Sequence, residues 1–485
     1  MPETTTSEPT APEPAAASAH PAFPDFPAGF EFGVSTAAYQ IEGAVDADGR
    51  GPSIWDTFSH EPGRVVGGDT GDVACDHYHR YAEDIALMSG LGVDTYRFSV
   101  AWPRVQPDGR GAVNERGLDF YRRLVDDLLA ADIKPCLTLY HWDLPQPLED
   151  AGGWRVRDTA ERFADYARIV FAALGDRVPM WITLNEPYCS AIVGHAEGRH
   201  APGTVEGEGA LAAAHHLLLG HGLAVNAMRE AGARARGARI GITLNPSPMH
   251  AASDDPADVA AAERAWVLNT GLFSEPVLGG RYPEAAREIW SGATDFAFVR
   301  DGDMAITSAP LDFVGVNYYF REHWRAAPYE VADPAVRPAN DIGAEKVRPA
   351  GVSDYTESGW PVEPAGLTEV LTALAERYPD IPPVYVTENG RACPDVPGDD
   401  GVVDDRDRIA FVAAHLHALR AAMDQGVDVR GYYHWSLLDN FEWAEGYAKR
   451  FGLVYVDYPT GRRVPKAAYH WFREQLTARY GDGAR

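Results

Sequence analysis

The sequence is poor in cysteine, and it contains no long apolar run. Only four cysteines occur among its 485 residues, and no CxxC or nearby histidine pair suggests zinc. A chain of this length has no need of disulfide bonds, so Cys75, Cys136, Cys189 and Cys393 are expected to be free thiols in a reducing compartment. No apolar stretch approaches the length of a membrane span, so no membrane partner is expected.

Basic residues are also scarce relative to acidic ones. The chain has 43 Lys and Arg against 71 Asp and Glu, a formal net charge of -28. Such a surface repels phosphate backbones, which argues against nucleic acid or anionic lipid as a partner. The GxSxG, P-loop and GxGxxG motifs are absent, so serine-hydrolase and nucleotide-binding functions lack support.

The chain divides into a short N-terminal segment and one long folded region. The first 21 residues lack the basic start and apolar stretch of a signal peptide, and their Pro, Ala, Thr and Glu content is typical of a disordered tail. After them no linker-like stretch interrupts the sequence. We therefore expect a disordered tail over 1–21, a single domain over 22–482 and a cytoplasmic location.

Eight short apolar runs alternate with amphipathic segments in the folded region. Several runs, such as Val384–Val386, are continuously apolar, as in parallel strands buried on both faces. This alternation favours a single-domain α/β fold, a (β/α)8 TIM barrel with long rim loops, over a doubly wound sheet. The predicted strands are Glu31–Tyr39, Thr95–Val100, Lys134–His141, Met180–Pro187, Arg239–Asn245, Phe313–Tyr319, Pro383–Asn389 and Val429–Leu437.

The segments between the runs read as helices. Apolar residues share one face of Glu115–Asp132 at helical spacing. Asp158 and Glu161 resemble a capping box that opens another helix. A further helix over Asp405–Gln425 would end before Gly426, a residue suited to the position after a helix. Long insertions at 251–310 and 320–364 are expected to supply loops over one rim of the barrel.

Polar side chains gather at the predicted strand ends, which converge on the rim where barrel active sites form. These residues are Gln40, His141, Asn185, Glu186, Asn245, Asn317, Glu388, Asn389, Trp435 and Ser436. Any one glutamate is more often solvated or salt-bridged than catalytic. Two in similar settings, within Thr183–Pro187 and Thr387–Gly390, indicate a functional pair. Glycoside cleavage needs such a pair, one carboxyl protonated and the other ionised.

From about Phe26 to Tyr480, the chain resembles glycoside hydrolase family 1, the β-glucosidase family, in its bacterial intracellular type. The two glutamate motifs match that family's acid/base and nucleophile motifs, in that order. The other matching stretches are Phe30–Gly43, Arg97–Ser99, His141–Pro145, Asn317–Tyr319 and Trp435–Trp443. The family implies a barrel enzyme that cleaves β-glycosides with retention of configuration.

The resemblance implies a role for each matching residue. Glu186 would be the acid/base and Glu388 the nucleophile, with Arg97 and Tyr319 holding Glu388 ionised. The residues implied to bind substrate are Gln40, His141, Trp142, Asn185, Asn317, Tyr319, Trp360, Trp435, Glu442 and Trp443.

Some of these roles are specific. Asn185 would bind the sugar 2-hydroxyl, and Glu442 would accept the 4- and 6-hydroxyls. Trp435 would lie beneath the sugar's apolar face, and Trp360 would be the platform for the aglycone. The family also implies a cis peptide bond between Trp435 and Ser436.

The sequence departs from the family pattern at Arg391, His434 and Glu445, and none of the three removes a catalytic group. Arg391 could place a cation near the pocket edge and alter the pKa of Glu388 or the aglycone preference. Cys189 is expected to be a packing residue behind the acid/base. His77 and His79, on a predicted helix, are interpreted as packing or hydrogen-bonding residues rather than metal ligands.

The leading hypothesis is a retaining β-glucosidase that acts on cellobiose, short cello-oligosaccharides and aryl β-glucosides. Side activity on β-galactosides or β-fucosides and transglycosylation are consistent with it. A 6-phospho-β-glucosidase is disfavoured, because Glu442 would repel a phosphate. A catalytically dead carbohydrate-binding barrel is disfavoured too, because both glutamates are present. No metal, nucleotide or organic cofactor is expected, since two carboxylates and water suffice.

Overall fold

The centre of the molecule is a closed barrel of eight parallel strands. The computed structural model describes residues 21–399 and 401–481, and the strands close in the order β1-β11-β10-β7-β5-β4-β3-β2. The predicted (β/α)8 fold is therefore confirmed, whereas the tail expected over 1–21 lies outside the described residues except for Pro21. The strand bounds are β1 (Glu31–Ser35), β2 (Thr95–Ser99), β3 (Lys134–Tyr140), β4 (Met180–Asn185), β5 (Arg239–Leu244), β7 (Phe313–Asn317), β10 (Val384–Asn389) and β11 (Val429–Trp435).

Each of the eight predicted runs forms a strand, but most of the strands stop short of the predicted end. The largest difference is at β1, because Ala38–Ile41 turns into the short helix α1. This turn carries Gln40 away from the strand and into the rim, where its side chain is fully buried.

Side chains along the strands alternate between the inside of the barrel and the surrounding helices. On β10, Tyr385 belongs to a small separate apolar cluster, while Val384 and Val386 pack in the main core. The other members of the small cluster are Cys136, Met180, Ile182, Phe313 and Tyr433. Burial on both faces explains why these strands are apolar without interruption.

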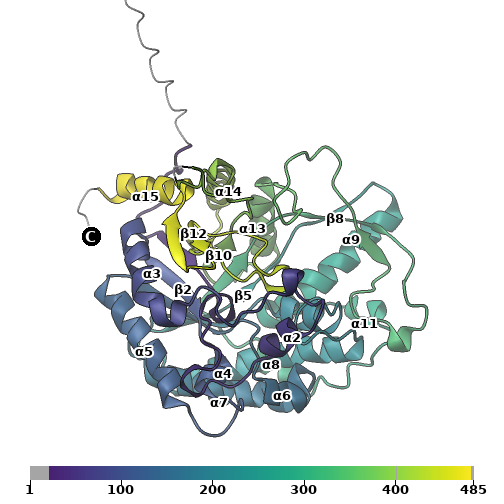
Figure 1. The fold of residues 1–485 in the computed structure, drawn as a ribbon. Helices are drawn as coiled ribbons and strands as arrows, with labels where there is room; N and C mark the ends of the chain where they lie inside the picture. The colour runs from purple at the N-terminus through teal and green to yellow at the C-terminus, as the bar shows by residue number, and fades with distance from the viewer. Residues whose placement is uncertain (1–20, 400, 482–485) are drawn as a thin grey trace, which may run out of the picture.

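A ring of helices surrounds the strands. Figure 1 shows α3, α5, α7 and α8 in turn around one side of the barrel, with α14 and α15 across the strands from α7. The long helices are α3 (His77–Leu91), α5 (Glu115–Ala130), α7 (Arg157–Leu174), α8 (Glu208–Glu230), α9 (Pro256–Trp266), α13 (Ala365–Arg377), α14 (Arg406–Asp424) and α15 (Ala467–Tyr480). The short ones are α2 (Ile54–His60), α4 (Trp102–Val105), α6 (Gln146–Asp150), α10 (Leu272–Ser274), α11 (Ala286–Ile289) and α12 (Asp303–Thr307).

The predicted capping box at the start of α7 is wrong. The helix begins at Arg157, after an extended Val156, so the N-cap is two residues earlier than predicted and Asp158 lies inside the first turn without making a cap. There its charge suits the helix dipole, and it pairs with Arg162 at 3.1 Å. The helix end predicted at Gly426 is confirmed, since Gly426 follows α14 with a φ of 99°.

The two insertions differ from the expected loops. Residues 251–310 are largely helical, because they contain α9 to α12 and two five-residue π-helical segments. Residues 320–364 contribute β8 (Glu322–Ala326) and β9 (Ala344–Lys346), which form a small sheet with β6 (Met249–Ala251). A hairpin of β12 (Val454–Asp457) and β13 (Arg462–Pro465) was not predicted.

The first described residues pack against α15, the last helix of the chain. The indole nitrogen of Trp471 donates to the carbonyl of Pro21 at 2.8 Å, and Gln475 accepts from the backbone nitrogen of Phe23 at 3.0 Å. Across residues 21–399 and 401–481, none of the helices combines the length and apolar character that crossing a bilayer requires. All four cysteines are free, as predicted.

We predict that Gly315→Ala destabilises the barrel. A Cβ at Gly315, on β7, would lie 2.2 Å from Thr243 Oγ1 and 2.8 Å from Thr387 Oγ1. Because both neighbours sit on barrel strands, they cannot easily move away, and overpacking of this kind costs about 1–3 kcal/mol. Calorimetry should show a lower midpoint of thermal unfolding.

Gly279→Ala is the matched control, since the nearest atom to its added Cβ is 4.0 Å away, on Tyr378. Equal unfolding midpoints for the two variants would contradict the prediction.

Candidate active site

The carboxyl ends of the barrel strands surround one cavity of about 290 Å³. Ten of the thirteen residues predicted from the sequence for the site line it, and they come from the ends of β3, β4, β7, β10 and β11 and from the loops beyond them. These ten are His141, Trp142, Glu186, Asn317, Tyr319, Trp360, Glu388, Trp435, Glu442 and Trp443. The other three are buried and contact lining residues: Gln40 lies beside Glu442, Arg97 beside Glu388 and Asn185 beside His141.

Glu388, on β10, is held by two donors. Arg97 Nη1 lies 2.6 Å from its Oε1, and the Tyr319 hydroxyl donates to its Oε2 at 2.7 Å. The guanidinium is 1% exposed, so water screens this ion pair little. The two residues that the family resemblance linked to Glu388 therefore both contact its carboxyl group.

Glu186, just beyond β4, has a different environment. Asn317 Nδ2 donates to its Oε1 at 2.6 Å, and no cation pairs with it among the described residues. Burial, together with the neighbouring charge of Glu388, raises the pKa of Glu186 to about 7. The two carboxyl groups therefore have different partners, and Glu186 is suited to hold a proton near neutral pH.

Cys189 contacts the same carboxyl group. Its Sγ donates to Glu186 Oε2 at 3.1 Å, and it also lines the cavity. The expectation of a packing residue behind the acid/base is therefore wrong. The backbone nitrogen of Cys189 donates to the Glu186 carbonyl at 2.9 Å, and this tight turn brings position 189 next to the carboxyl group.

Arg97, on β2, also organises the wall behind the two glutamates. Its Nη2 donates to Asn185 Oδ1 at 2.5 Å, and Asn317 Nδ2 donates to the same oxygen at 3.1 Å. Asn185 Nδ2 lies 3.0 Å from His141 Nε2. Burial and the charge of Arg97 lower the pKa of His141 well below its usual range, so the imidazole is neutral.

Glu442 is a third carboxyl group in the cavity. Burial, then the charges of Glu388, Glu445 and Glu186, raise its pKa to about 8. Gln40 Nε2 lies 3.4 Å from its Oε2 and donates to Asn440 Oδ1 and the Phe441 carbonyl at 3.0 and 2.9 Å. Gln40 Oε1 is buried and has no partner among the described residues, so it can accept a hydrogen bond from a bound molecule.

Aromatic rings form much of the remaining wall. Trp142 and Trp443 lie 4.5 Å apart between ring centroids, and Trp142 Nε1 donates to the Asn185 carbonyl at 2.9 Å. Trp360, from the second insertion, packs against Phe320 with centroids 5.0 Å apart. The cis peptide bond expected between Trp435 and Ser436 is present.

The outer lining of the cavity was not predicted from the sequence. There Glu322 Oε1 pairs with Lys346 Nζ at 2.7 Å, on strands β8 and β9. The outer lining residues come from the loops after β4, β5 and β11 and from the two insertions, which have no recognisable spacing, and only Asn245 was marked by its position at a strand end. The unassigned lining residues are Tyr188, Val193, Arg199, His200, Asn245, Ser247, Asn269, Phe320, Glu322, Lys346, Ser358, Ala444, Glu445 and Phe451.

The idea that Arg391 places a cation at the pocket edge is wrong. Its guanidinium forms two hydrogen bonds to Asp354 at 2.9 and 3.0 Å, and it does not line the cavity. His434 is fully buried away from the cavity. His77 bonds Asp84 at 2.8 Å and His79 bonds Asp76 at 2.6 Å, as hydrogen-bonding residues should. Over the described ranges, no group of three His, Cys, Asp or Glu residues has metal-site geometry.

Comparison with known proteins places this geometry in context. Residues 23–480 match the family model described as glycosyl hydrolase family 1. Beta-glucosidase A of Acetivibrio thermocellus is 45% identical over 93% of this chain and 98% of its own length. The bifunctional beta-D-glucosidase/beta-D-fucosidase of Bifidobacterium breve is 47% identical over 92% and 97%. The solved structure of the Thermotoga maritima beta-glucosidase in complex with deoxynojirimycin superposes with a TM-score of 0.86 at 44% identity, covering 93% of this chain and 98% of that one.

Proposed function

The chain belongs to glycosyl hydrolase family 1, and on that premise we propose that Glu186 and Glu388 carry out the reaction of a retaining β-glucosidase. Its substrates are terminal non-reducing β-D-glucosyl residues of cellobiose, short cello-oligosaccharides and aryl β-glucosides. The observation that carries the proposal is the contrast between the two carboxyl groups. Glu388 is paired with a buried guanidinium, whereas Glu186 is buried without a cation and its pKa is raised to about 7.

In the first step, a carboxylate oxygen of Glu388 attacks the anomeric carbon. The glycosidic C–O bond breaks, and Glu186 gives its proton to the departing oxygen. The product is a glycosyl ester on Glu388 and a free aglycone. Arg97 and Tyr319 hold the carboxylate in place for attack and stabilise it again when it leaves.

In the second step, the ionised Glu186 takes a proton from water while the water oxygen attacks the anomeric carbon. The ester bond breaks, Glu388 regains its charge and Glu186 regains its proton. Two inversions at one carbon return the original β configuration.

The residues around the glutamates fit a neutral sugar. Asn185 gives one Nδ2 proton to His141, which leaves its second proton for the 2-hydroxyl. Gln40 Oε1 accepts from another hydroxyl, and Glu442 takes the 4- and 6-hydroxyls. Trp435 lies below the ring, and Trp360 supports the aglycone.

A phosphorylated sugar fits this site poorly. Its dianion would enter a cavity that already holds the carboxyl groups of Glu442, Glu186 and Glu388. The negative charge there already raises the pKa of Glu442 and Glu186, so further negative charge is opposed. A binding-only barrel is not favoured either, since both carboxyl groups are present with distinct partners. Activity on β-fucosides is compatible with the site, because a relative carries that activity in its name.

We predict that Glu388→Gln and Glu186→Gln lose activity in different ways. Glu388→Gln replaces the attacking carboxylate with an amide, which is a very weak nucleophile, so hydrolysis of every β-glucoside should cease. Glu186→Gln should lose about 10²–10⁴-fold with a poor leaving group such as methanol, because general acid assistance is worth that much. With dinitrophenol as leaving group, the first step should survive in Glu186→Gln and the glycosyl ester should accumulate.

Stopped-flow release of dinitrophenol and mass spectrometry of the trapped ester would measure these steps. The roles are reversed if the ester accumulates instead in the Glu388→Gln variant, attached to Glu186. An inactive wild-type enzyme with p-nitrophenyl β-glucoside would overturn the proposed function itself.

The pH dependence gives a separate prediction. Glu186 must be protonated in the first step, so kcat/KM should fall as pH rises through its pKa of about 7. The hydrogen bond from Cys189 favours the ionised form and lowers that pKa. Removing it in Cys189→Ala should therefore shift the alkaline limb to higher pH, and Cys189→Ser, with a stronger donor, should shift it to lower pH.

The measurement is the pH profile of kcat/KM for all three proteins. Cys393→Ala is the control, since that thiol is buried and does not line the cavity. Overlapping alkaline limbs for Cys189→Ala, Cys189→Ser and wild type would refute the assigned contact.

A further inference from the structure

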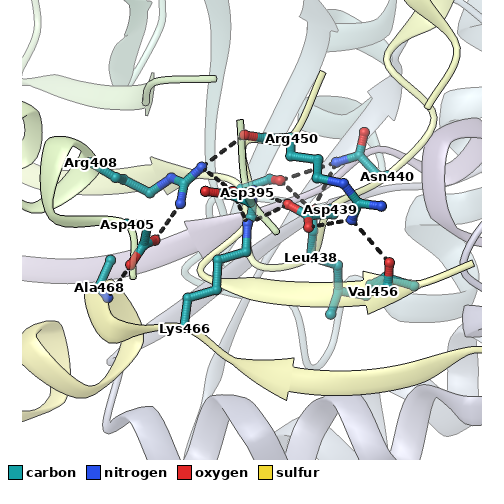
Figure 2. Close-up of polar contacts among 12 residues, drawn as sticks. Asp395, Asp405, Arg408, Leu438, Asp439, Asn440, Arg450, Val456, Lys466 and Ala468 are labelled. Carbon is teal, nitrogen blue, oxygen red and sulfur yellow. Dashed lines mark hydrogen bonds and ion pairs between the residues drawn. The ribbon is translucent and has the colours of Figure 1, made fainter. Parts of the chain in front are cut away.

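Six charged side chains are buried together beside the segment that ends in Glu442, and the proposed chemistry uses none of them (Figure 2). Three are acidic and three are basic, so this six-residue network carries no net charge. All but Arg450 have side chains at most 2% exposed. The members are Asp395, Asp405, Arg408, Asp439, Arg450 and Lys466.

Lys466 joins the two halves of the network. Its Nζ lies 2.5 Å from Asp395 Oδ2 and 2.6 Å from Asp439 Oδ1. On one side, Arg408 pairs with Asp395 at 2.7 Å and also with Asp405. On the other side, Arg450 pairs with Asp439 Oδ2 at 2.8 Å. Removing the ammonium would leave one uncompensated negative charge in the interior, which is costly.

The network ties outer helices to the rim of the barrel. Lys466 is the residue before α15, and Arg408 lies in the first turn of α14. Asp405 Oδ1 accepts from the backbone nitrogen of Ala468 at 2.7 Å, which links the starts of the two helices. The network therefore fixes Asp439 relative to two helices, α14 and α15, rather than to a loop.

Asp439 begins a four-residue stretch, 439–442, that ends in the sugar-binding carboxyl group. Its Oδ1 also accepts from the backbone nitrogen of Gly452 at 2.9 Å. At the other end, Gln40 Nε2 donates to Asn440 Oδ1 and the Phe441 carbonyl and lies 3.4 Å from Glu442 Oε2. The stretch is thus held at one end by the network and at the other by Gln40, a substrate-binding candidate.

We infer that Lys466 is a positioning residue for sugar recognition. By holding Asp439, it fixes the stretch that carries Glu442 and so sets how strongly the enzyme prefers a glucoside over a xyloside, which lacks the 6-hydroxymethyl group. The inference rests on the proposed function, specifically on Glu442 as the acceptor of the 4- and 6-hydroxyls. Lys466 does not line the cavity, so its effect on selectivity has to pass through Asp439.

The test compares kcat/KM for p-nitrophenyl β-glucoside and p-nitrophenyl β-xyloside. Both release the same leaving group, so their ratio reports contacts at the 6-position. Lys466→Met should lower the ratio at least about threefold, in the range of effects that coupled residues exert on a remote site. Glu442→Gln should lower it further. The double variant Lys466→Met/Glu442→Gln should show no lower ratio than Glu442→Gln alone, since both changes act through one group.

Two further variants separate positioning from stability. Asp395→Asn/Lys466→Met removes one charge of each sign, so it keeps the interior balanced and provides a second route to the same test if Lys466→Met does not fold. Arg157→Met breaks another ion pair to a buried aspartate, the 2.6 Å contact with Asp303, and should leave the sugar ratio at the wild-type value.

The outcomes are distinct. A lowered ratio in either Lys466 variant, absent in Arg157→Met and absent in the Glu442→Gln background, supports the inference. A wild-type ratio in both Lys466 variants, when Glu442→Gln does lower it, overturns the inference and leaves the proposed function standing. A wild-type ratio in Glu442→Gln overturns the role of Glu442 and the inference together.

Discussion

The arrangement of the site depends on the buried guanidinium group of Arg97. From β2 it reaches the carboxylate of Glu388 on β10 and the amide oxygen of Asn185 on β4. It also donates to the carbonyl of Thr387 at 3.1 Å. One buried cation therefore pairs with the proposed nucleophile and also holds the amide of Asn185, the residue before the proposed acid/base. Breaking a buried pair of this kind leaves an uncompensated charge in the interior. A shift of β2, β4 or β10 would therefore also disturb the carboxyl groups of the site.

The same cation also produces the asymmetry between the two glutamates. The guanidinium pairs with Glu388, whereas the side-chain partners of Glu186 are the amide of Asn317 and the thiol of Cys189. In a cavity with little water, the charge of Glu388 then opposes ionisation of Glu186. Two chemically identical side chains thereby acquire different electrostatic environments, because one cation contacts only one of them.

The sequence predicted the barrel well because strand burial and strand-end polarity are local patterns. All eight strands and the motifs around Glu186, Glu388 and Glu442 could be read from it. The outer wall could not, since Glu322 and Lys346 meet only after two strands of an insertion pair. The prediction for Cys189 was wrong because its contact with Glu186 depends on a tight turn directly after β4. The prediction for Arg391 was wrong because its partner, Asp354, lies in the second insertion.

The site therefore has two sides built in different ways. The inner side is held by barrel strands and by buried charges, so its residues are constrained by neighbours on several elements at once. The outer side is formed by the loops that follow β4, β5 and β11 and by the two insertions. There the Glu322–Lys346 pair includes a lysine whose side chain is half exposed. Because water screens a half-exposed pair, replacing Lys346 costs the fold less than breaking the fully buried pair of Arg97. It follows that the proposed sugar-binding residues cannot change without disturbing the barrel. Residues of the outer wall, which would contact the leaving group, can change without disturbing it.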